Sequence, residues 1–418
     1  MKLLHRWGLA LAAVWLVLAG PLAAAGTVQG FDPVRLQRLD AFFQDYVDRH
    51  QVAGSVLFVA RDGHIVRLKA FGQQDIATGK PMKTDTIFRV ASMSKAVTSV
   101  AVMMLYEEGK FMLHDPVGKY IPAFAHSVVA VPPPAGSPPG TKYTTVPAKR
   151  PIQIRDLLSQ TSGLSYGGGV VAEAYKRANL SGWFFANHDE TIGEAIDRLG
   201  TLPLNAQPGE AWVYGFSTDV LGRLVEVVSG MPLDKFVEER ICRPLGMKDT
   251  SFFLPPEKAS RLATLYGLVD GKLVADTTAE QTAYVTGPRK CFSGGAGLLT
   301  TANDYGRFLQ MLLNGGELDG VRLLSPKTVE LMHANHTGDK YHGQGNAFGL
   351  GFWVNNNLGD PGELSSVGTY GWGSAYYPQY AVDPQERLVM FFLTQLKPAG
   401  TVDLNMKYRV LTYQALVK

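Results

Sequence analysis

Apolar positions recur at helical spacing at the start of the chain and then form two short strand-like runs. In residues 32–50 the apolar side chains lie three and four positions apart, which predicts an amphipathic helix. Residues 54–60 and 64–71 are apolar runs separated by Arg61-Asp62-Gly63, a turn sequence that predicts a β-hairpin. We therefore expect a helix followed by two paired strands.

Helical patterns dominate the middle of the chain. Helices are predicted over residues 92–108, 218–229 and 303–313. Residues 131–151 contain seven prolines and residues 163–169 are rich in glycine, so both segments are expected to be irregular loops.

Strand patterns return near the C-terminus. Ala375–Val382 and Leu388–Thr394 are strand-like and are joined by a turn at Asp383-Pro384, and residues 402–416 again look helical. Strand patterns thus cluster at both ends of the chain, whereas helices fill the middle. The simplest architecture is an α/β fold in which both chain ends build one sheet flanked by helices, with a mainly helical insertion.

The length and composition are those of a folded globular chain. Its 418 residues are 46% hydrophobic and 18% charged, so it can bury a large core and is not expected to be disordered. The expected organisation is one unit over residues 26–418. Its α/β part is expected at about residues 30–95 and 290–418, and its helical part at about residues 96–289.

The N-terminal segment has the features of a secretory signal peptide. A basic stretch at residues 2–6 precedes an apolar run at residues 8–20, which is too short to span a bilayer comfortably. Ala23–Ala25 then supplies small residues for cleavage after Ala25, and an uncleaved anchor is the alternative. No later segment approaches transmembrane length, so we expect a periplasmic or secreted product with no stable membrane span after signal removal.

Neither the net charge nor the cysteine content identifies a binding partner. Without residues 1–25 the chain has 38 basic and 37 acidic residues, because that segment holds two basic residues and no acidic one. This balance gives no reason to expect nucleic acid or an anionic membrane as a partner, and no pattern points to an oligomeric state. Cys242 and Cys291 either form one disulfide or remain two buried thiols.

The candidate chemistry begins in residues 88–100, FRVASMSKAVTSV. Ser92 and Lys95 are three residues apart, so a helix places both side chains on one face. The first helical turn favours a developing anion and a neutral lysine, and a neutral lysine accepts the serine proton. The apolar helix that follows predicts a partly desolvated lysine. A capped surface helix is the alternative for this pattern taken alone.

Two later segments carry further candidates. Tyr214 lies in a loop that enters a predicted helix, and a phenol beside a serine–lysine pair can relay a proton to a leaving group. The alternative is a core tyrosine with a satisfied hydroxyl. Gly371–Ala375 opens a predicted strand, where small residues admit substrate close to the backbone and an N–H can stabilise an oxyanion. A glycine-rich turn with a packed tryptophan is the alternative.

Together these motifs resemble the serine β-lactamase and penicillin-binding-protein superfamily. That group has an S-x-x-K motif, a tyrosine motif about 120 residues later and a glycine-containing strand motif near the C-terminus. The sequence is most similar to the esterase branch, the family VIII carboxylesterases, and to class C β-lactamases. Residues 154–164, 219–230, 243–250 and 293–313 also resemble this family. The resemblance covers roughly residues 35–415 and implies a β-lactamase-like fold with an antiparallel sheet.

The resemblance implies a role for each matched residue. Ser92 would form the acyl-enzyme, Lys95 would act as its base and Tyr214 as the proton relay. The backbone N–H groups of Ser92 and Ala375 would form the oxyanion hole. Trp372 would stand where β-lactamases carry the lysine of their K-T-G motif. The implied enzyme needs neither a cofactor nor a metal.

Departures from the β-lactamase pattern bear on the substrate. Phe216 stands where class C enzymes have an asparagine, and Trp372 and Gly373 replace the lysine and threonine of K-T-G. The replaced groups would bind the acylamide and carboxylate of a β-lactam. We therefore expect Phe216, Trp372, Gly373 and Ser374 to line an apolar substrate pocket. Ser374 also departs from the W-G-G that is usual in the esterase branch.

Two other patterns compete with this reading. Gly163–Gly167 matches G-x-S-x-G, but that motif requires a strand before the serine and a helix after it, whereas a helical pattern precedes Ser165. We therefore interpret it as a loop. His333, His336 and His342 lie within ten residues of one another without a well-placed carboxylate, so solvated loop histidines are expected rather than a metal site.

The function that the sequence favours is a serine carboxylesterase that hydrolyses short-chain apolar esters. Within the same enzyme class, a β-lactamase and a D-amino-acid-directed peptidase are the alternatives. From another class, the alternative is a non-catalytic homologue that binds peptidoglycan or a partner. Intact Ser92, Lys95 and Tyr214 argue against that last alternative, because a binding protein does not need a desolvated lysine beside a serine.

Overall fold

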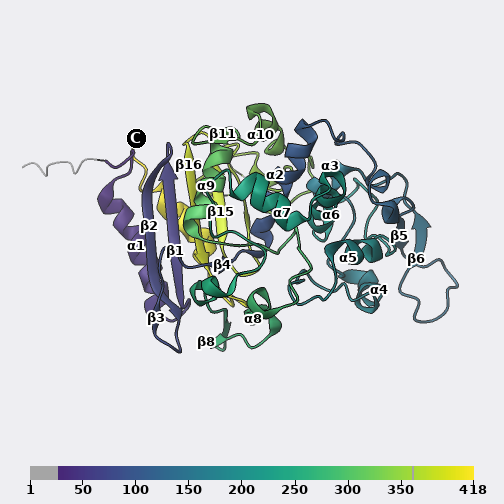
Figure 1. Cartoon of the computed structure of the whole chain (residues 1–418), viewed down its shortest axis with the longest axis horizontal. Coiled ribbons are helices and arrows are strands. Elements are labelled where there is room, and N and C mark those ends of the chain that lie inside the picture. Colours follow the sequence, from purple (N-terminus) through teal and green to yellow (C-terminus); the bar gives the residue numbers. More distant parts are fainter. Residues whose placement is uncertain (1–26, 360–361) are drawn as a thin grey trace, which may run out of the picture.

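The computed structural model describes residues 27–359 and 362–418, so the signal peptide expected at residues 1–25 lies outside the described residues. Figure 1 shows a large sheet toward one end of the molecule and a group of helices toward the other. The sheet has eight strands in the order β12-β13-β14-β15-β16-β1-β2-β3, and neighbouring strands are antiparallel. The two ends of the chain thus meet in one sheet, which confirms the predicted fold class.

The strands of this sheet are β1 (Gly54–Arg61), β2 (His64–Asp75), β3 (Lys80–Pro81), β12 (Asn346–Phe348), β13 (Trp353–Asn355), β14 (Tyr370–Gly373), β15 (Gln379–Asp383) and β16 (Leu388–Thr394). Within the described residues, two-stranded ribbons are formed by β4 (Phe88–Arg89) with β9 (Leu299–Thr300), β5 (Val128–Val131) with β6 (Thr144–Pro147), β7 (Tyr266–Val269) with β8 (Lys272–Ala275), and β10 (Glu317–Leu318) with β11 (Val321–Arg322). The α-helices are α1 (Pro33–Asp48), α2 (Ser94–Glu107), α3 (Ile154–Leu158), α4 (Ala172–Arg177), α5 (Ile192–Leu199), α6 (Ser217–Ser229), α7 (Leu233–Val237), α8 (Ala279–Thr286), α9 (Ala302–Leu313), α10 (Pro326–Met332) and α11 (Leu404–Tyr413).

The central strands are buried on both faces, and their residues alternate between two hydrophobic cores. In β16, Val389 and Phe391 belong to the core shared with the helical part, whereas Met390 and Phe392 belong to the core on the other side. Helices α1 and α11 cover that second side, and α9 packs against β1, β15 and β16 on the first. A strand covered on both faces is apolar at nearly every position, which explains the continuous apolar run in the sequence of β16.

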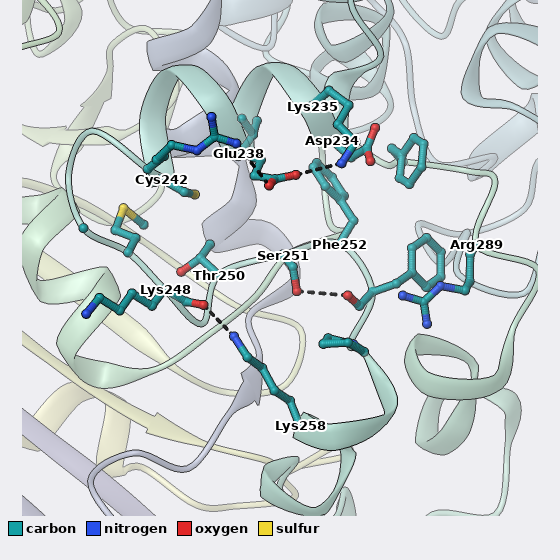
Figure 2. Close-up of a pocket in the computed structure, with 17 residues that line it drawn as sticks. Asp234, Lys235, Glu238, Cys242, Lys248, Thr250, Ser251, Phe252, Lys258 and Arg289 are labelled. Carbon is teal, nitrogen blue, oxygen red and sulfur yellow. Dashed lines mark hydrogen bonds and ion pairs between the residues drawn. The ribbon is translucent and has the colours of Figure 1, made fainter.

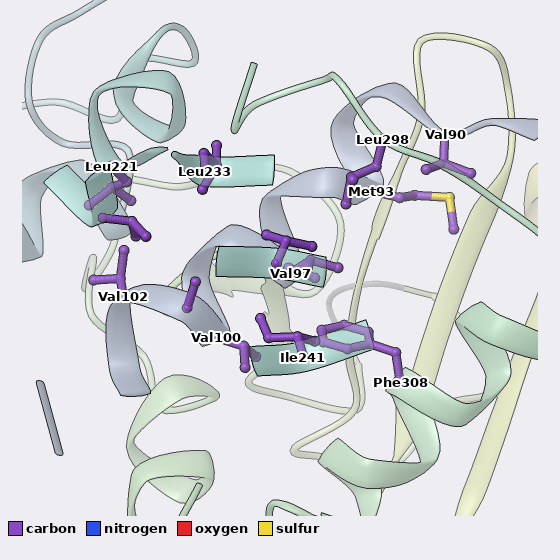
Figure 3. Packing of buried hydrophobic residues seen from close by; sticks show 14 of the residues in the cluster. Val90, Met93, Val97, Val100, Val102, Leu221, Leu233, Ile241, Leu298 and Phe308 are labelled. Carbon is purple, nitrogen blue, oxygen red and sulfur yellow. The ribbon is translucent and has the colours of Figure 1, made fainter. Parts of the chain in front are cut away.

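Helix α2 runs through the larger core. Twelve of its fourteen residues are buried, and it packs against α6 and α7. Figure 3 shows Val97 and Val100 surrounded by side chains of neighbouring elements, among them Leu221, Leu233 and Phe308. A helix that is apolar on all sides is stable only when it is buried. The start of α2, which follows the candidate nucleophile, is therefore held in place by packing on every side.

The segment Gly371–Ala375 ends a strand instead of opening one. Strand β14 stops before Ser374, whose N–H donates to the carbonyl of Pro378 and closes a turn. The strand predicted over Ala375–Val382 therefore begins only at Gln379. The physical reason is that the backbone groups of the turn bond to one another and are not available to the sheet.

The structure decides between the two alternatives for the cysteines. Cys242 and Cys291 are both free and buried, and burial raises the pKa of each thiol. Within residues 27–359 and 362–418, none of the helices combines the length and hydrophobicity that a bilayer-spanning segment needs.

Candidate active site

Ser92 lies in a tight turn between a short strand and the buried helix. The turn, Ala91–Met93, is a single 3₁₀ turn that leads directly into α2, and β4 before it is paired with β9. Ala91 has a φ of 36° and is fully buried. A non-glycine residue in the left-handed region costs about 1–3 kcal/mol and persists only where its surroundings impose it, which is common at functional sites. The fold thus forces the Ser92 hydroxyl into a fixed position.

Lys95 is buried beside this serine. Its side chain is 1% exposed, and Nζ donates to the Ser92 hydroxyl at 3.3 Å, to the Tyr166 hydroxyl at 3.0 Å and to the Gly295 carbonyl at 2.8 Å. In the described residues no carboxylate lies within ion-pair distance of Nζ. Three neutral partners therefore hold the amino group, and one of them is the Ser92 hydroxyl.

Tyr214 completes a triangle of contacts with these two residues. Its hydroxyl donates to the Ser92 Oγ at 2.7 Å, and Lys95 Nζ lies 4.7 Å from the centre of its ring. The Tyr214 oxygen in turn accepts from the indole N–H of Trp372 at 3.2 Å. The structure therefore brings together Ser92, Lys95 and Tyr214, which the sequence singled out from separate motifs. Each proton that leaves Ser92 has two acceptors within hydrogen-bond reach.

Tyr166 is a partner of Lys95 that the sequence reasoning missed. It belongs to the glycine-rich loop after α3, and its ring stands edge-on to that of Tyr214, with 5.5 Å between ring centres. Burial raises the pKa of Tyr166 well above its ordinary value, and the nearby Tyr214 and Asp219 add to that effect. Tyr166 therefore stays protonated and acts as a neutral hydrogen-bond partner of the amine.

The neighbouring Ser165 has a structural role in the same loop. Its hydroxyl donates to the Asn205 side chain at 2.7 Å and accepts from the N–H of Gly167 at 3.2 Å. Helix α3 precedes this loop, and a 3₁₀ turn, Gly169–Val171, follows it. The strand–serine–helix context of a nucleophile elbow is therefore missing, as expected from the sequence.

Ala375, which the family resemblance assigned to the oxyanion hole, lies close to the turn that carries Ser92. It packs with Ala91 in a small apolar cluster next to Ser92, and β14 contacts the turn that carries Ser92. Across the described part of the chain, no acceptor takes the N–H of Ala375. The Ser374 hydroxyl accepts from the N–H of Tyr376 at 3.1 Å and so stabilises the turn. The N–H of Ala375 thus remains available to a developing negative charge.

The residues expected to line the substrate pocket separate into two groups. Trp372, Gly373 and Ser374 are all half-buried at the end of β14, and Trp372 also packs against Phe348, with ring centres 5.2 Å apart. Phe216, in contrast, has no exposed surface and packs behind Tyr166 with ring centres 4.9 Å apart. Its expected contact with substrate has no support in this packing, because α6 begins directly after it and turns the ring into the core.

Two of the three clustered histidines are packed and not solvated, whereas His342 is exposed in a loop as expected. His333 ends α10 and stacks on Tyr370, with ring centres 5.1 Å apart, and the His336 ring lies 2.8 Å from the Leu331 carbonyl. Burial lowers the pKa of both imidazoles. Among the described residues, no group of three or more His, Cys, Asp or Glu side chains is placed to hold a metal ion.

A separate cavity of about 740 Å³ lies between α7 and the segment after it (Figure 2). Its charged side chains are largely engaged with neighbours: Lys235 pairs with Glu238, and Lys258 donates to the Lys248 carbonyl. The Cys242 thiol on its wall has a raised pKa because it is buried. None of the residues around Ser92 lines this cavity, and it supplies no activated nucleophile.

Replacing Tyr166 by phenylalanine is expected to lower kcat about tenfold and to leave KM nearly unchanged. The change removes one hydrogen bond to Lys95 and keeps the ring, and hydrogen bonds to charged groups are worth about 1.5–3 kcal/mol. Tyr175→Phe is the matched control, because Tyr175 is also buried and packs against Phe216 but bonds to the Pro203 carbonyl instead. Equal losses in both variants would show that Tyr166 matters only for packing.

Comparison with known proteins agrees with this geometry. The family model described as Beta-lactamase matches residues 39–414. Protein Rv1367c of Mycobacterium tuberculosis is 36% identical over 384 residues, covering 87% of this chain and 90% of that protein. Esterase EstB of Burkholderia gladioli is 31% identical over 386 residues, covering 87% of this chain and 91% of that protein. The solved structure of EstCE1, a hydrolase with promiscuous acyltransferase activity, matches with a TM-score of 0.75 at 26% identity, covering 91% of this chain and 98% of that chain. With the fold, the Ser92 site and these matches in agreement, the chain belongs to the beta-lactamase family of serine hydrolases.

Proposed function

We propose that this chain is a carboxylesterase that hydrolyses short-chain apolar esters through an acyl-enzyme on Ser92. The observation that carries the proposal is the set of aromatic side chains around Ser92. Tyr214 donates a hydrogen bond to Ser92, and Trp372 donates one to Tyr214. The similarity to EstB, which is named an esterase, supports an ester as the substrate class.

Acylation uses this triangle of contacts among Ser92, Lys95 and Tyr214 directly. The Ser92 oxygen attacks the ester carbonyl carbon while its proton passes to neutral Lys95, 3.3 Å away. The carbonyl oxygen becomes an oxyanion, which the N–H groups of Ser92 and Ala375 stabilise. When the tetrahedral intermediate collapses, the bond to the alcohol oxygen breaks. Tyr214 delivers a proton to that oxygen and recovers one from Lys95, so the alcohol leaves neutral and the lysine is neutral again.

Deacylation repeats these steps with water as the nucleophile. A water molecule gives its proton to the Tyr214–Lys95 pair and attacks the acyl carbonyl carbon. The second tetrahedral intermediate breaks the bond to Ser92 Oγ, and the proton returns to that oxygen. The carboxylic acid product leaves, and the starting triangle is restored.

The preference for an uncharged, apolar substrate follows from Trp372. A lysine at this position would pair with the carboxylate of a β-lactam, whereas an indole offers one N–H, which Tyr214 already accepts. The ring packs against Phe348 and Trp212, with ring centres 5.2 Å and 6.3 Å apart, so its surroundings are aromatic. An apolar wall stabilises an alkyl group by burial and offers a carboxylate no compensation for its lost hydration.

A substrate panel tests the proposal. We expect kcat/KM for p-nitrophenyl butyrate to exceed that for nitrocefin and for a peptide ending in D-alanyl-D-alanine by about 10²-fold or more. Nitrocefin and the peptide each carry a carboxylate for which the pocket offers no polar partner, whereas the butyrate ester carries none. The three rates are measured on one enzyme preparation, with p-nitrophenyl dodecanoate as the long-chain comparison.

Two results would contradict the proposal in different ways. Faster turnover of nitrocefin or of the peptide would assign the enzyme to a β-lactamase or a peptidase. Failure of a fluorophosphonate to label Ser92 in the folded protein would favour a non-catalytic binding role, because labelling requires an activated serine whatever the natural substrate is.

A further inference from the structure

Asp219 is a buried carboxylate that the mechanism above does not use. It lies in the first turn of α6 and is 1% exposed. Its Oδ1 accepts from the Ser293 hydroxyl at 2.5 Å and from the Gly295 N–H at 3.0 Å, whereas Oδ2 has no hydrogen-bond partner in the described residues. A buried carboxylate oxygen without a partner is costly, so its presence here calls for a reason beyond packing.

Gly295 links this carboxylate to the lysine. Its N–H donates to Asp219, and its carbonyl accepts from Lys95 Nζ at 2.8 Å. A side chain at this position would not fit, because a Cβ on Gly295 would lie 2.6 Å from Oδ2 of Asp219. Asp219 therefore fixes the residue whose carbonyl orients the Lys95 amine toward Ser92.

Asp219 also interacts electrostatically with Lys95. Burial raises the pKa of Asp219, and the positive charge of Lys95 opposes that rise. The other titratable groups that face this pair are Tyr166, Tyr214 and the Cys291 thiol. Burial raises the pKa of Tyr166 and of Cys291, so both remain uncharged near neutral pH. Of these groups, Asp219 is the acid whose charged form interacts with the charged form of Lys95.

We propose that Asp219 is a positioning residue that holds Gly295, and through it Lys95, in line with Ser92, and that its negative charge sets the pH above which Lys95 accepts the serine proton. The proposal rests on the acyl-enzyme function proposed above. When the serine proton moves to Lys95, a positive charge develops on Nζ, and the nearby carboxylate stabilises it. Asp219 itself gives up no proton and takes none.

The Asp219→Asn variant separates charge from shape. The amide oxygen can still accept from Ser293 and Gly295, but the negative charge is gone. Because an anion favours the ammonium form of a nearby amine, its loss lets Lys95 become neutral at lower pH. We expect the acidic limb of the kcat/KM–pH profile to move down by about one pH unit, and the plateau rate to fall about tenfold because the developing charge is less stabilised.

Two rates are followed from pH 5 to pH 10, namely p-nitrophenyl butyrate hydrolysis and covalent labelling of Ser92 by a fluorophosphonate. Both are expressed per labelled active site, which removes any effect of misfolded protein. The labelling profile does not depend on the natural substrate. If the wild-type protein labels but does not turn over esters, the proposed function fails, while the shift in the labelling profile still decides the role of Asp219.

Asp304→Asn is the matched control. Asp304 in α9 is 2% exposed and accepts from the Asp249 N–H at 2.6 Å and from the Thr250 hydroxyl at 3.0 Å, so it makes the same kinds of bond without a bond to Gly295. We expect this variant to change the melting temperature but not the pH profile. A second test variant, Gly295→Ala, pushes the carboxylate aside with its charge intact and is expected to lower kcat about tenfold with KM nearly unchanged.

The proposal is overturned if the acidic limb of Asp219→Asn coincides with that of the wild type or moves to higher pH. It is also overturned if Asp219→Asn and Asp304→Asn lower the melting temperature alike and both retain wild-type rates per labelled site. If Asp219→Asn does not fold, wild-type kcat in folded Gly295→Ala overturns the positioning role, and a tenfold loss supports it.

Discussion

Replacing Ser92 by alanine is expected to reduce kcat for p-nitrophenyl butyrate by at least about 10³-fold, because it removes the hydroxyl that we propose forms the acyl-enzyme. The Ser92 Oγ is the atom on which Lys95 and Tyr214 converge, at 3.3 Å and 2.7 Å. The residual rate would come from substrate binding and the oxyanion hole alone. The melting temperature should change little, because the variant removes one oxygen from an 8% exposed side chain.

Ser165→Ala is the control that distinguishes the two candidate serines. The Ser165 hydroxyl is also buried, but its bonds go to Asn205 and Gly167, so its loss should cost some stability and leave more than about half of the activity. Initial rates and mass spectrometry of the acylated protein give the answer. An acyl group on Ser165, or an active Ser92→Ala enzyme, would contradict the assignment of Ser92 as the nucleophile.

Replacing Lys95 by methionine is expected to lower kcat by about 10²–10⁴-fold while the protein stays folded. Methionine fills a similar volume and replaces an amino group that is 1% exposed and has no carboxylate in ion-pair contact in the described residues. The lost hydrogen bonds to Tyr166 and Gly295 are offset because the variant no longer buries an amino group. We therefore expect the melting temperature to remain within a few degrees of the wild-type value, measured by circular dichroism.

A second substitution at this position separates a base from a simple cation. Arginine keeps the positive charge, but its guanidinium does not give up a proton in proteins, so Lys95→Arg should be as inactive as Lys95→Met. Lys119→Met is the surface control, since Lys119 is mostly exposed and pairs with Asp115. An arginine variant with more than about a tenth of wild-type activity would mean that Lys95 acts through its charge and not as the acceptor of the serine proton.

Local features of the site could be predicted from the sequence because they depend on near neighbours. The i, i+3 spacing of Ser92 and Lys95 brings the two side chains together on one helical turn, wherever that helix lies in the fold. The apolar run after Lys95 requires a buried helix, and a buried helix desolvates the lysine at its start. Turn residues 61–63 between two apolar runs likewise required a hairpin.

Two sequence predictions were wrong because the local pattern of residues did not determine the structure there. Gly371–Ala375 looked like the start of a strand, but the backbone bond from Ser374 to Pro378 makes it a strand end followed by a turn. Phe216 looked like a pocket residue, yet the helix that begins after it directs its ring into the core. Both outcomes depend on which backbone groups find partners, and short stretches of sequence do not specify this.

By itself, the sequence determined the fold class and the pairing of Ser92 with Lys95, because these depend on periodicity and on contacts within one turn of helix. Only the tertiary structure decided which distant groups surround Ser92. Tyr214 bonds to Ser92 from 122 residues away, and Tyr166 and Gly295 bond to Lys95 from 71 and 200 residues away. Packing of α2 against α6 and of β14 against the turn at Ser92 accompanies these contacts. Asp219 was not singled out from the sequence. Its link to Lys95 exists only because the folded core leaves it no water and brings Gly295 between the two charges.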